Sequence, residues 1–346
     1  MTAPTLADRV VAWQSVHGRN DLPWQGAREP YHVWLSEIML QQTQVATVRD
    51  YFTRFLQRFP DLASLAAASL DDVLGLWSGL GYYSRARNLH RCAVEVCRDY
   101  GGVFPRSAQQ LQTLPGIGRS TAAAISSLCF GERVAILDGN VKRVVCRALG
   151  FDADLSLHAN EQRLWDHATA LLPTRQMARA MPRYTQGLMD LGATVCTLRQ
   201  PDCAVCPLAA DCVAKREGAP ERYPVKTRKL KRSSQSLWLL WLVTKGNDVW
   251  LNQRPMPGVW AGLFCLPLFD DRASLEAALP DPFRQELVDV PPVRHVLTHK
   301  DLHLHPVRLV LPNTSVRPGG EGAWFEAQRW PSMGLPAPIR KLLDRD

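Results

Sequence analysis

The chain changes its hydrophobic pattern near Gln235, and this change constrains the fold more than any other sequence feature. Before about Gly218, apolar residues recur at spacings of three and four, as in residues 62–77. After Gln235, strand-like runs such as SLWLLWLV, DVWLNQR and HLHPVRLVLP are separated by turn signals. Helices and strands bury apolar residues at different spacings. A chain of 346 residues that contains both patterns is therefore predicted to form two domains. We expect an all-helical first domain and a smaller α+β second domain with helices near residues 273–278 and 339–343.

A basic segment separates the two patterns. Residues 221–236, ERYPVKTRKLKRSSQS, contain six Lys or Arg, one Glu, a Pro and a Ser cluster. This composition is typical of an exposed linker, and its charge also suits a phosphate backbone. We therefore predict a helical domain over residues 1–220, a linker over 221–236 and a second domain over 237–346.

The net charge favours a polyanionic partner. The chain has 41 Lys and Arg against 33 Asp and Glu, a formal charge of +8. Nucleic acid is the first candidate and an anionic membrane surface the second, with a merely solvated basic surface as the alternative. No apolar run is long enough to span a membrane, and the N-terminal residues show no signal-peptide pattern. We expect a soluble monomer in the cytoplasm, nucleoid-associated in a bacterium, with no membrane partner.

Four of the nine cysteines fall within seventeen residues and have the spacing C-x6-C-x2-C-x5-C. They are Cys196, Cys203, Cys206 and Cys212. Four thiolates in so short a span can enclose one metal centre. Zinc prefers two C-x2-C pairs, whereas cubane iron-sulfur clusters accept less regular spacing, so a cluster is favoured and zinc stays open. The other five cysteines lie among apolar neighbours and are expected in the core.

The string LPGIGRSTA at residues 114–122 ends one helical segment and begins the next. Gly116 and Gly118 let the backbone turn sharply and present consecutive N–H groups to an oxyanion, beside the positive end of the following helix. Such a turn grips a phosphate without reading a base. It predicts a helix-hairpin-helix over about residues 108–125, against the alternative of an ordinary turn between helices.

Two carboxylates stand in unusual surroundings. Asp138, in ILDGNVKRV, precedes a clear helix, whose N–H groups should keep it ionised; a simple N-cap is the alternative. Glu37, in YHVWLSEIMLQQT, has apolar neighbours and few charges to pair with. Burial there would raise its pKa towards neutrality and suit it to general acid catalysis, against the alternative of an exposed helix glutamate.

These motifs together resemble a known enzyme family. LPGIGRSTA, LDGNVKRV and the cysteine spacing are similar to the helix-hairpin-helix DNA glycosylases that carry a [4Fe-4S] cluster. LPWQ at 22–25, SEIMLQQTQV at 36–45 and GLGYYSRARNL at 79–89 resemble the MutY-type adenine DNA glycosylases in particular. The resemblance implies a [4Fe-4S] cluster held by the loop over residues 196–212.

The resemblance also implies a reaction. Adenine mispaired with 8-oxoguanine or guanine in double-stranded DNA would be removed by hydrolysis of its N-glycosidic bond. Glu37 would protonate N7 of the adenine and later activate water, and Asp138 would stabilise the oxocarbenium-like sugar. Asn140 would orient the water or the sugar.

The family's DNA contacts map onto this chain as well, because the target base must leave the stack to be cut. Gln42 and Tyr82 would wedge into the DNA. Trp24, Leu40 and Gln186 would border the adenine, with plain core packing as the alternative for Trp24 and Leu40. Gly116, Gly118 and Lys142 would contact phosphates.

The residue at position 120 distinguishes this chain from the bifunctional relatives of the family. Bifunctional endonuclease III-like glycosylases have a lysine where this chain has Ser120, and lysine can form a Schiff base that leads to strand cleavage. Serine cannot, so a monofunctional enzyme is implied. Many adenine glycosylases have Tyr at this position, so the catalytic share of Ser120 stays open.

The second domain resembles the Nudix-like C-terminal domain of these glycosylases, with NQRPMPGVWAGLF at residues 252–264 as its best match. DPFRQELVDV at 281–290 lacks paired magnesium-binding glutamates, so pyrophosphate hydrolysis is not expected. Thr298 and His299 align with the family loop, usually Phe-Ser-His, that recognises 8-oxoguanine. Two rivals remain, a bifunctional endonuclease III-like pyrimidine glycosylase with lyase activity and a non-catalytic mismatch-binding protein.

Overall fold

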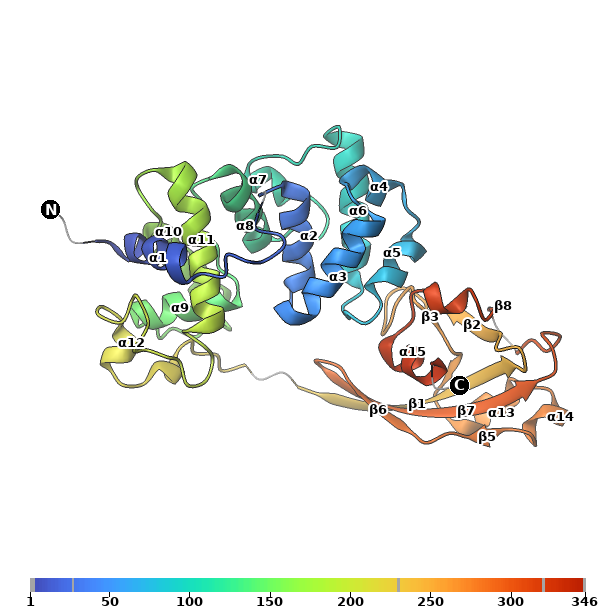
Figure 1. The fold of residues 1–346 in the computed structure, drawn as a ribbon. Coiled ribbons are helices and arrows are strands. Elements are labelled where there is room, and N and C mark those ends of the chain that lie inside the picture. Colours follow the sequence, from blue (N-terminus) through green and yellow to red (C-terminus); the bar gives the residue numbers. More distant parts are fainter. Residues whose placement is uncertain (1–3, 27, 229–230, 319–320, 345–346) are drawn as a thin grey trace. The chain divides into compact units, whose positions relative to one another are not determined.

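The computed structural model describes residues 4–26, 28–228, 231–318 and 321–344, and it divides into two compact units (Figure 1). The helical unit comprises Met1–Ala66 and Arg91–Lys229. The sheet unit comprises Ala67–His90 and Leu230–Asp346.

The helical unit contains no strand among its described residues, as the sequence pattern predicts. Its helices are α1 (Leu6–His17), α2 (Pro30–Leu40), α3 (Val45–Arg58), α4 (Leu62–Ala67), α7 (Ala108–Leu111), α8 (Arg119–Phe130), α9 (Gly139–Leu149), α10 (His158–Ala170), α11 (Met177–Thr194) and α12 (Val213–Arg216), with a 3-10 turn η1 (Pro220–Arg222). Helix α6 (Ser84–Asp99) begins in the sheet unit and ends in the helical unit.

Helix α11 packs closely against both α1 and α9 because it carries glycine at the two contact points. A Cβ atom on Gly187 would lie 2.8 Å from Val10 Cγ1 on α1. A Cβ atom on Gly192 would lie 2.7 Å from the Cβ of Asn140 on α9. Side chains at either glycine would force the helices apart. The two glycines therefore set the position of α11 between its neighbours.

The predicted helix-hairpin-helix is present as α7, a turn and α8. Gly116 has the positive φ of 77° that the turn requires, and Gly118 is the N-cap of α8. Ile117, between the two glycines, is buried and anchors the turn. A Cβ atom on Gly118 would meet nothing within 4 Å, so the backbone there is open to approach.

The sheet unit is built around one mixed sheet. Its strands are β1 (Ser233–Thr244), β2 (Val249–Gln253), β3 (Phe264–Cys265), β4 (Leu268–Phe269), β5 (Val288–Asp289), β6 (Val293–Val296), β7 (Lys300–Leu311) and β8 (Ala323–Phe325). The order is β3-β2-β1-β7-β5, with β4 on β1, β6 on β7 and β8 on β2. Strands β1 and β7 run parallel, in register from Ser233↔Lys300 to Thr244↔Leu311.

Helices α5 (Leu70–Trp77), α13 (Arg272–Ala277), α14 (Asp281–Arg284) and α15 (Ala337–Leu343) and a 3-10 turn η2 (Trp330–Ser332) complete the sheet unit. The two helices predicted near residues 273–278 and 339–343 are thereby confirmed. Buried Leu240 and Val307 belong to one hydrophobic cluster of the sheet. The predicted α+β class is confirmed.

Residues 67–90 belong to the sheet unit although the sequence pattern places them in the helical half. Gly75 lies so close to Ser332 that an added Cβ would be 2.2 Å from its carbonyl oxygen. Tyr83 Oη donates a 3.0 Å hydrogen bond to the carbonyl of Leu335. These contacts join residues more than 250 positions apart, which local periodicity does not reveal.

The basic segment is only partly free. Tyr223 is buried, and the N–H of Leu155 donates to the carbonyl of Val225 at 3.0 Å. The hydroxyl of Thr227 donates to Asp154, so this part of the segment is held on the helical unit. Residues 229–230 lie outside the described residues, and β1 already begins at Ser233.

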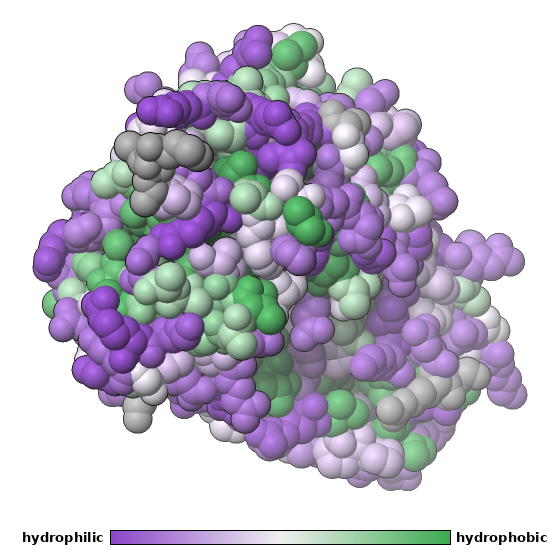
Figure 2. Space-filling model, turned by 60° about the vertical axis from the view of Figure 1, so that its left-hand side comes forward, coloured by the Kyte–Doolittle hydropathy of each residue, from purple (hydrophilic) through white to green (hydrophobic). Residues whose placement is uncertain are grey.

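No helix in the described part of the chain combines the length and apolar character needed to cross a bilayer. On the face shown in Figure 2, hydrophilic side chains predominate and hydrophobic ones form small separate groups.

Candidate active site

A cavity of about 130 Å³ in the helical unit contains the predicted acid. Of the residues predicted around the target base, Glu37, Trp24 and Gln186 line it, whereas Leu40 does not. Trp24 is buried, packs against the ring of Phe52 and also lines this cavity. Its contact with the base stays a prediction. The sequence did not single out the other lining residues, which are Gln14, Asn20, Gln25, Arg28, Val33, Ser36, Leu128, Pro182 and Arg183.

Glu37 lies on α2 between the buried residues Ser36 and Ile38. Burial raises the pKa of its carboxyl from 4.5 to about 7, and the negative charge of Asp138 acts in the same direction. The predicted upward shift is confirmed. Near neutral pH this carboxyl still holds a proton in much of the population, as a general acid must.

Asp138 is the N-cap of α9, and its Oδ1 accepts the N–H of Val141 at 2.7 Å. Burial raises the pKa of Asp138, while the N–H groups of Val141 and Asn140 and the Arg143 and Lys142 charges oppose the rise. The capping position is therefore correct. The net shift of this pKa is upward, because desolvation outweighs the helix N–H groups and the two cationic side chains.

Asn140 is held by a cationic side chain one turn along α9. Its Oδ1 accepts a 2.9 Å hydrogen bond from Arg143 Nη2. Arg143 also donates from Nε to the carbonyl of Cys196 at 2.7 Å and from Nη2 to that of Gly192 at 2.6 Å. The Asn140 side chain is thus fixed to the end of α11 and the start of the cysteine loop.

Ser120 and Lys142 both make internal contacts. Ser120 Oγ accepts the N–H of Leu137 at 3.3 Å, so it supports the backbone directly before Asp138. Lys142 Nζ forms an ion pair with Glu161. A lysine engaged in this way is a weaker phosphate ligand than a free one.

The two residues predicted to wedge into DNA have the same unusual backbone. Gln42 has φ 57° and Tyr82 has φ 49°, in the left-handed region that side chains rarely adopt. Gln42 is exposed in the helical unit, and Tyr82 is 43% exposed in the sheet unit. Strain of this kind is concentrated at functional sites.

Within the sheet unit, Tyr82 Oη and Thr298 Oγ1 share a hydrogen bond. Tyr82, Thr298 and His299 line a cavity of about 720 Å³ together with Trp260 and His295. The predicted recognition loop therefore lies beside one of the two predicted wedge residues.

The four clustered cysteines are free thiols that line one cavity of about 20 Å³. Burial raises the pKa of Cys206 to about 11; it also raises that of Cys196, where Arg147 opposes it. In the described residues, no three His, Cys, Asp or Glu side chains are arranged as ligands of one metal ion. The convergence of four sulfur donors on one cavity nevertheless fits a thiolate-bound cluster.

Arg147 supports this fit. Its side chain is buried and donates to the carbonyls of Thr197 at 2.6 Å and Leu198 at 3.0 Å. Its Nη1 also donates to Cys196 Sγ at 3.4 Å. A cationic donor on a sulfur stabilises the thiolate form that a metal centre needs. Of the five cysteines expected in the core, Cys92, Cys146 and Cys265 are buried, and Cys97 and Cys129 are half-buried.

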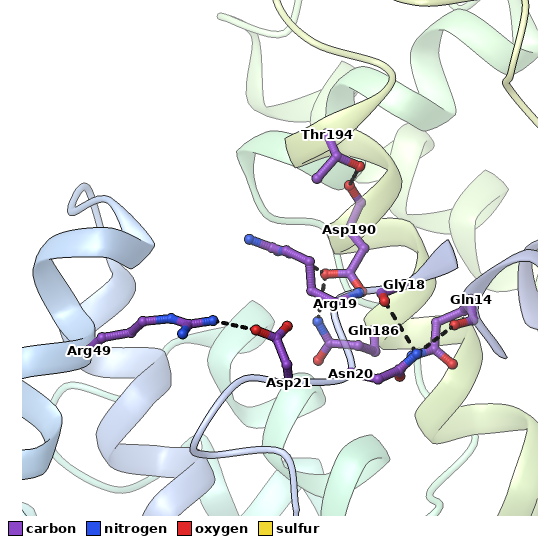
Figure 3. A network of polar contacts seen from close by, with 9 residues as sticks. All are labelled: Gln14, Gly18, Arg19, Asn20, Asp21, Arg49, Gln186, Asp190 and Thr194. Carbon is purple, nitrogen blue, oxygen red and sulfur yellow. Dashed lines mark hydrogen bonds and ion pairs between the residues drawn. The ribbon is translucent and has the colours of Figure 1, made fainter. Parts of the chain in front are cut away.

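The pocket has a polar border that sequence reasoning missed. Asp190 on α11 is fully buried and accepts hydrogen bonds from Arg19 and from Gln186 (Figure 3). The only local signal was the spacing of Gln186 and Asp190, four residues apart and hence on one face of a helix.

Comparisons with known proteins match both units. Residues 35–168 match the family model described as HhH-GPD superfamily base excision DNA repair protein, and residues 238–345 match that of the NUDIX domain. The adenine DNA glycosylase of Buchnera aphidicola subsp. Acyrthosiphon pisum (strain APS) is 36% identical over 352 residues, covering 99% of this chain and 98% of the relative. That of Homo sapiens is 44% identical over 222 residues, covering 62% of this chain and 40% of the relative. The solved structure of a thermostable thymine-DNA glycosylase has 28% identity and a TM-score of 0.54, covering 61% of this chain and 95% of its own.

Proposed function

Since this chain belongs to the adenine DNA glycosylase family, we propose that its substrate is adenine mispaired with 8-oxoguanine or guanine in double-stranded DNA. A DNA glycosylase hydrolyses the N-glycosidic bond between base and sugar. The observation that carries the proposal is Glu37, a carboxyl with a pKa of about 7 in the wall of a base-sized pocket.

Glu37 is the general acid of the proposed reaction. Adenine leaves poorly as an anion, so a proton must reach its ring nitrogen N7 before the bond breaks. The carboxyl that delivers the proton becomes a carboxylate and can then take a proton from the attacking water. Trp24 and Gln186 border the extruded base in the same pocket. Leu40 lies outside the pocket wall, so a contact with the base would require DNA to reshape the site.

Asp138 stabilises the positive charge that develops on the sugar. Its charge already acts on Glu37, which supports a position near the reacting bond. Once Glu37 has given up its proton, two carboxylates share the site, and the cationic sugar between them is favoured. Asn140, fixed by Arg143, is the proposed ligand of the water or the sugar.

The proposed enzyme is monofunctional and leaves an abasic site. Position 120 carries a hydroxyl, which cannot form a Schiff base with the sugar. The amine of Lys142 is engaged with Glu161. Both observations disfavour the rival endonuclease III-like lyase.

Two surfaces are proposed to hold the DNA. Gly116 and Gly118 present backbone N–H groups to a phosphate, and Lys142 adds charge if it exchanges Glu161 for DNA. Gln42 and Tyr82 are the proposed wedges. Thr298 and His299 are proposed to inspect the base opposite the adenine, with the Tyr82–Thr298 hydrogen bond linking wedge and inspection.

A [4Fe-4S] cluster held by Cys196, Cys203, Cys206 and Cys212 is part of the proposal, supported by their common cavity and the Arg147 donor. When bound, the cluster would cross-link the loop between α11 and α12. Its proposed role is structural. Monomeric action in the cytoplasm stays a prediction.

One assay tests the function. A duplex with adenine opposite 8-oxoguanine is incubated with the protein, and strand breaks are measured with and without hot alkali. Breaks that need alkali are expected. Absence of any base loss overturns the proposal, and breaks without alkali support the lyase instead.

A further inference from the structure

We infer that Asp190 positions the amide of Gln186 so that the pocket accepts a 6-amino purine and rejects a 6-oxo purine. The inference rests on the proposed function, in which Gln186 borders the extruded base. Asp190 is a positioning residue, because it acts on the base only through Gln186.

Three hydrogen bonds converge on the fully buried Asp190 carboxylate. Arg19 donates from its backbone N–H to Oδ2 at 3.1 Å and from Nε to Oδ1 at 2.7 Å. Gln186 donates from Nε2 to Oδ1 at 2.9 Å. Figure 3 shows the three side chains meeting at this point.

A carboxylate has no hydrogen to donate, so it determines which end of the Gln186 amide faces it. The NH2 group must turn towards Asp190, and the carbonyl oxygen Oε1 lies on the other side of the amide (Figure 3). No described residue donates a hydrogen bond to Oε1, and Gln186 lines the pocket. The Gln186 amide is therefore held in one orientation, in which its oxygen Oε1 is free to accept a hydrogen bond from the base.

That order matches adenine and opposes a 6-oxo purine. The amino group on C6 of adenine donates to an amide oxygen, and the adjacent ring nitrogen N1 can accept the remaining N–H, which leaves N7 to Glu37. Hypoxanthine and guanine carry a carbonyl oxygen at C6, which would face Oε1 as acceptor against acceptor. A freely rotating glutamine could turn over and bind either base, but the turned amide would place Oε1 against the Asp190 carboxylate.

The Asp190–Gln186 hydrogen bond is held in place from two helices. Arg19 follows the C-cap Gly18 of α1, and Asp190 lies one turn beyond Gln186 on α11. Gly187, beside Gln186, permits the close packing of these helices. The Arg19–Asp190 ion pair thus ties the amide orientation to the backbone of both helices.

The test is Asp190→Asn, which keeps the shape and one acceptor but adds an NH2 group that can pair with a turned Gln186 amide. Excision of adenine and of hypoxanthine, each opposite 8-oxoguanine, is measured in single turnover. One reversed hydrogen bond should lower the adenine to hypoxanthine rate ratio by about tenfold. The control is Asp21→Asn, an exposed ion pair with Arg49 in the same segment, which should leave the ratio unchanged.

A second variant, Gln186→Met, covers the case in which Asp190→Asn does not fold. It removes the amide, so it should lower the ratio at least as far, and adding Asp190→Asn to it should change the ratio no further. Thermal unfolding and duplex binding show whether each variant is folded. An unchanged ratio in folded Asp190→Asn, or in Gln186→Met, overturns the inference while wild-type adenine excision stands. Failure of the wild type to remove adenine overturns the proposed function itself.

Discussion

The negative charge of Asp138 helps to keep the Glu37 carboxyl protonated. Glu37 lies on α2 and Asp138 caps the start of α9, 101 positions further along the sequence. Burial is the larger cause of the Glu37 shift, and Asp138 adds to it. Asp138, which would stabilise the cationic sugar, thus also helps to keep Glu37 in its protonated form. The predictions that follow begin from this pair.

Replacing Glu37 with Gln should lower the rate of adenine excision by orders of magnitude but leave DNA binding intact. Glutamine has nearly the same shape but no acidic proton, and loss of a general acid costs about 10²- to 10⁴-fold in rate. Single-turnover excision and fluorescence anisotropy with an adenine:8-oxoguanine duplex measure the two properties. Near wild-type excision by the variant would remove Glu37 from the acid role.

The excision rate should fall as the pH rises through about 7, the pKa to which Glu37 is raised. The acid form is present below this pKa and is lost above it, so the rate should drop about tenfold per pH unit on the alkaline side. A single-turnover pH profile from 5.5 to 9 measures this alkaline limb, the fall in rate above the pKa. The residual rate of Glu37→Gln should lack it, and an identical limb in that variant would assign it to another group.

Replacing Ser120 with Lys should create strand cleavage that needs no alkali. A lysine amine there can attack the sugar and form a Schiff base, which the serine hydroxyl cannot do. Borohydride trapping of a covalent protein–DNA adduct measures the gain. Ser120→Ala, which also loses the acceptor for the Leu137 N–H, should trap no adduct. Trapping at the wild-type level in Ser120→Lys would show that position 120 does not face the sugar.

Replacing Thr298 with Ala should reduce the preference for 8-oxoguanine over guanine opposite the adenine. The variant loses its hydrogen bond to Tyr82, and one such bond is worth about 0.5 to 1.5 kcal/mol, or roughly two- to tenfold. Excision from the two duplexes at limiting enzyme gives the preference as a ratio. Thr53→Ala, an exposed threonine on α3, should leave that ratio as it is.

Purified protein should contain iron, and Cys206→Ser should lose most of it. The serine hydroxyl is a poor substitute for a thiolate ligand, and without the cluster the loop over residues 196–212 should unfold at lower temperature. Elemental analysis and the broad visible absorbance of the cluster measure loading. Cys97→Ser changes a half-buried cysteine outside the loop and should keep full iron content. Zinc in place of iron in the wild type would contradict the cluster.

Sequence periodicity was enough to predict the two fold classes, because helices and strands bury their faces at different spacings. It placed β1, β2 and β7 correctly. The helix-hairpin-helix was predictable from Gly116 and Gly118, because a sharp turn depends on local backbone chemistry. Glu37 was recognisable for the same reason, as a lone acid in an apolar segment.

What the sequence could not reveal depends on contacts between distant residues. The ion pair of Arg19 and Asp190 joins positions 171 residues apart and leaves no local pattern. For Asp138 the sequence shows the helix start, whose N–H groups favour the carboxylate, but not the burial, which raises its pKa. Leu40 follows the same rule, since the face of α2 that it occupies depends on packing.

The chain passes between its two units at residues 66–67, 90–91 and 229–230. A protein truncated after the basic segment keeps residues 67–90 but loses the carbonyls of Ser332 and Leu335, which meet Gly75 and Tyr83. Such a truncation would therefore remove these contacts together with the proposed inspection loop. Point substitutions such as Thr298→Ala, made in the full chain, should separate the proposed inspection of the opposite base from removal of the adenine.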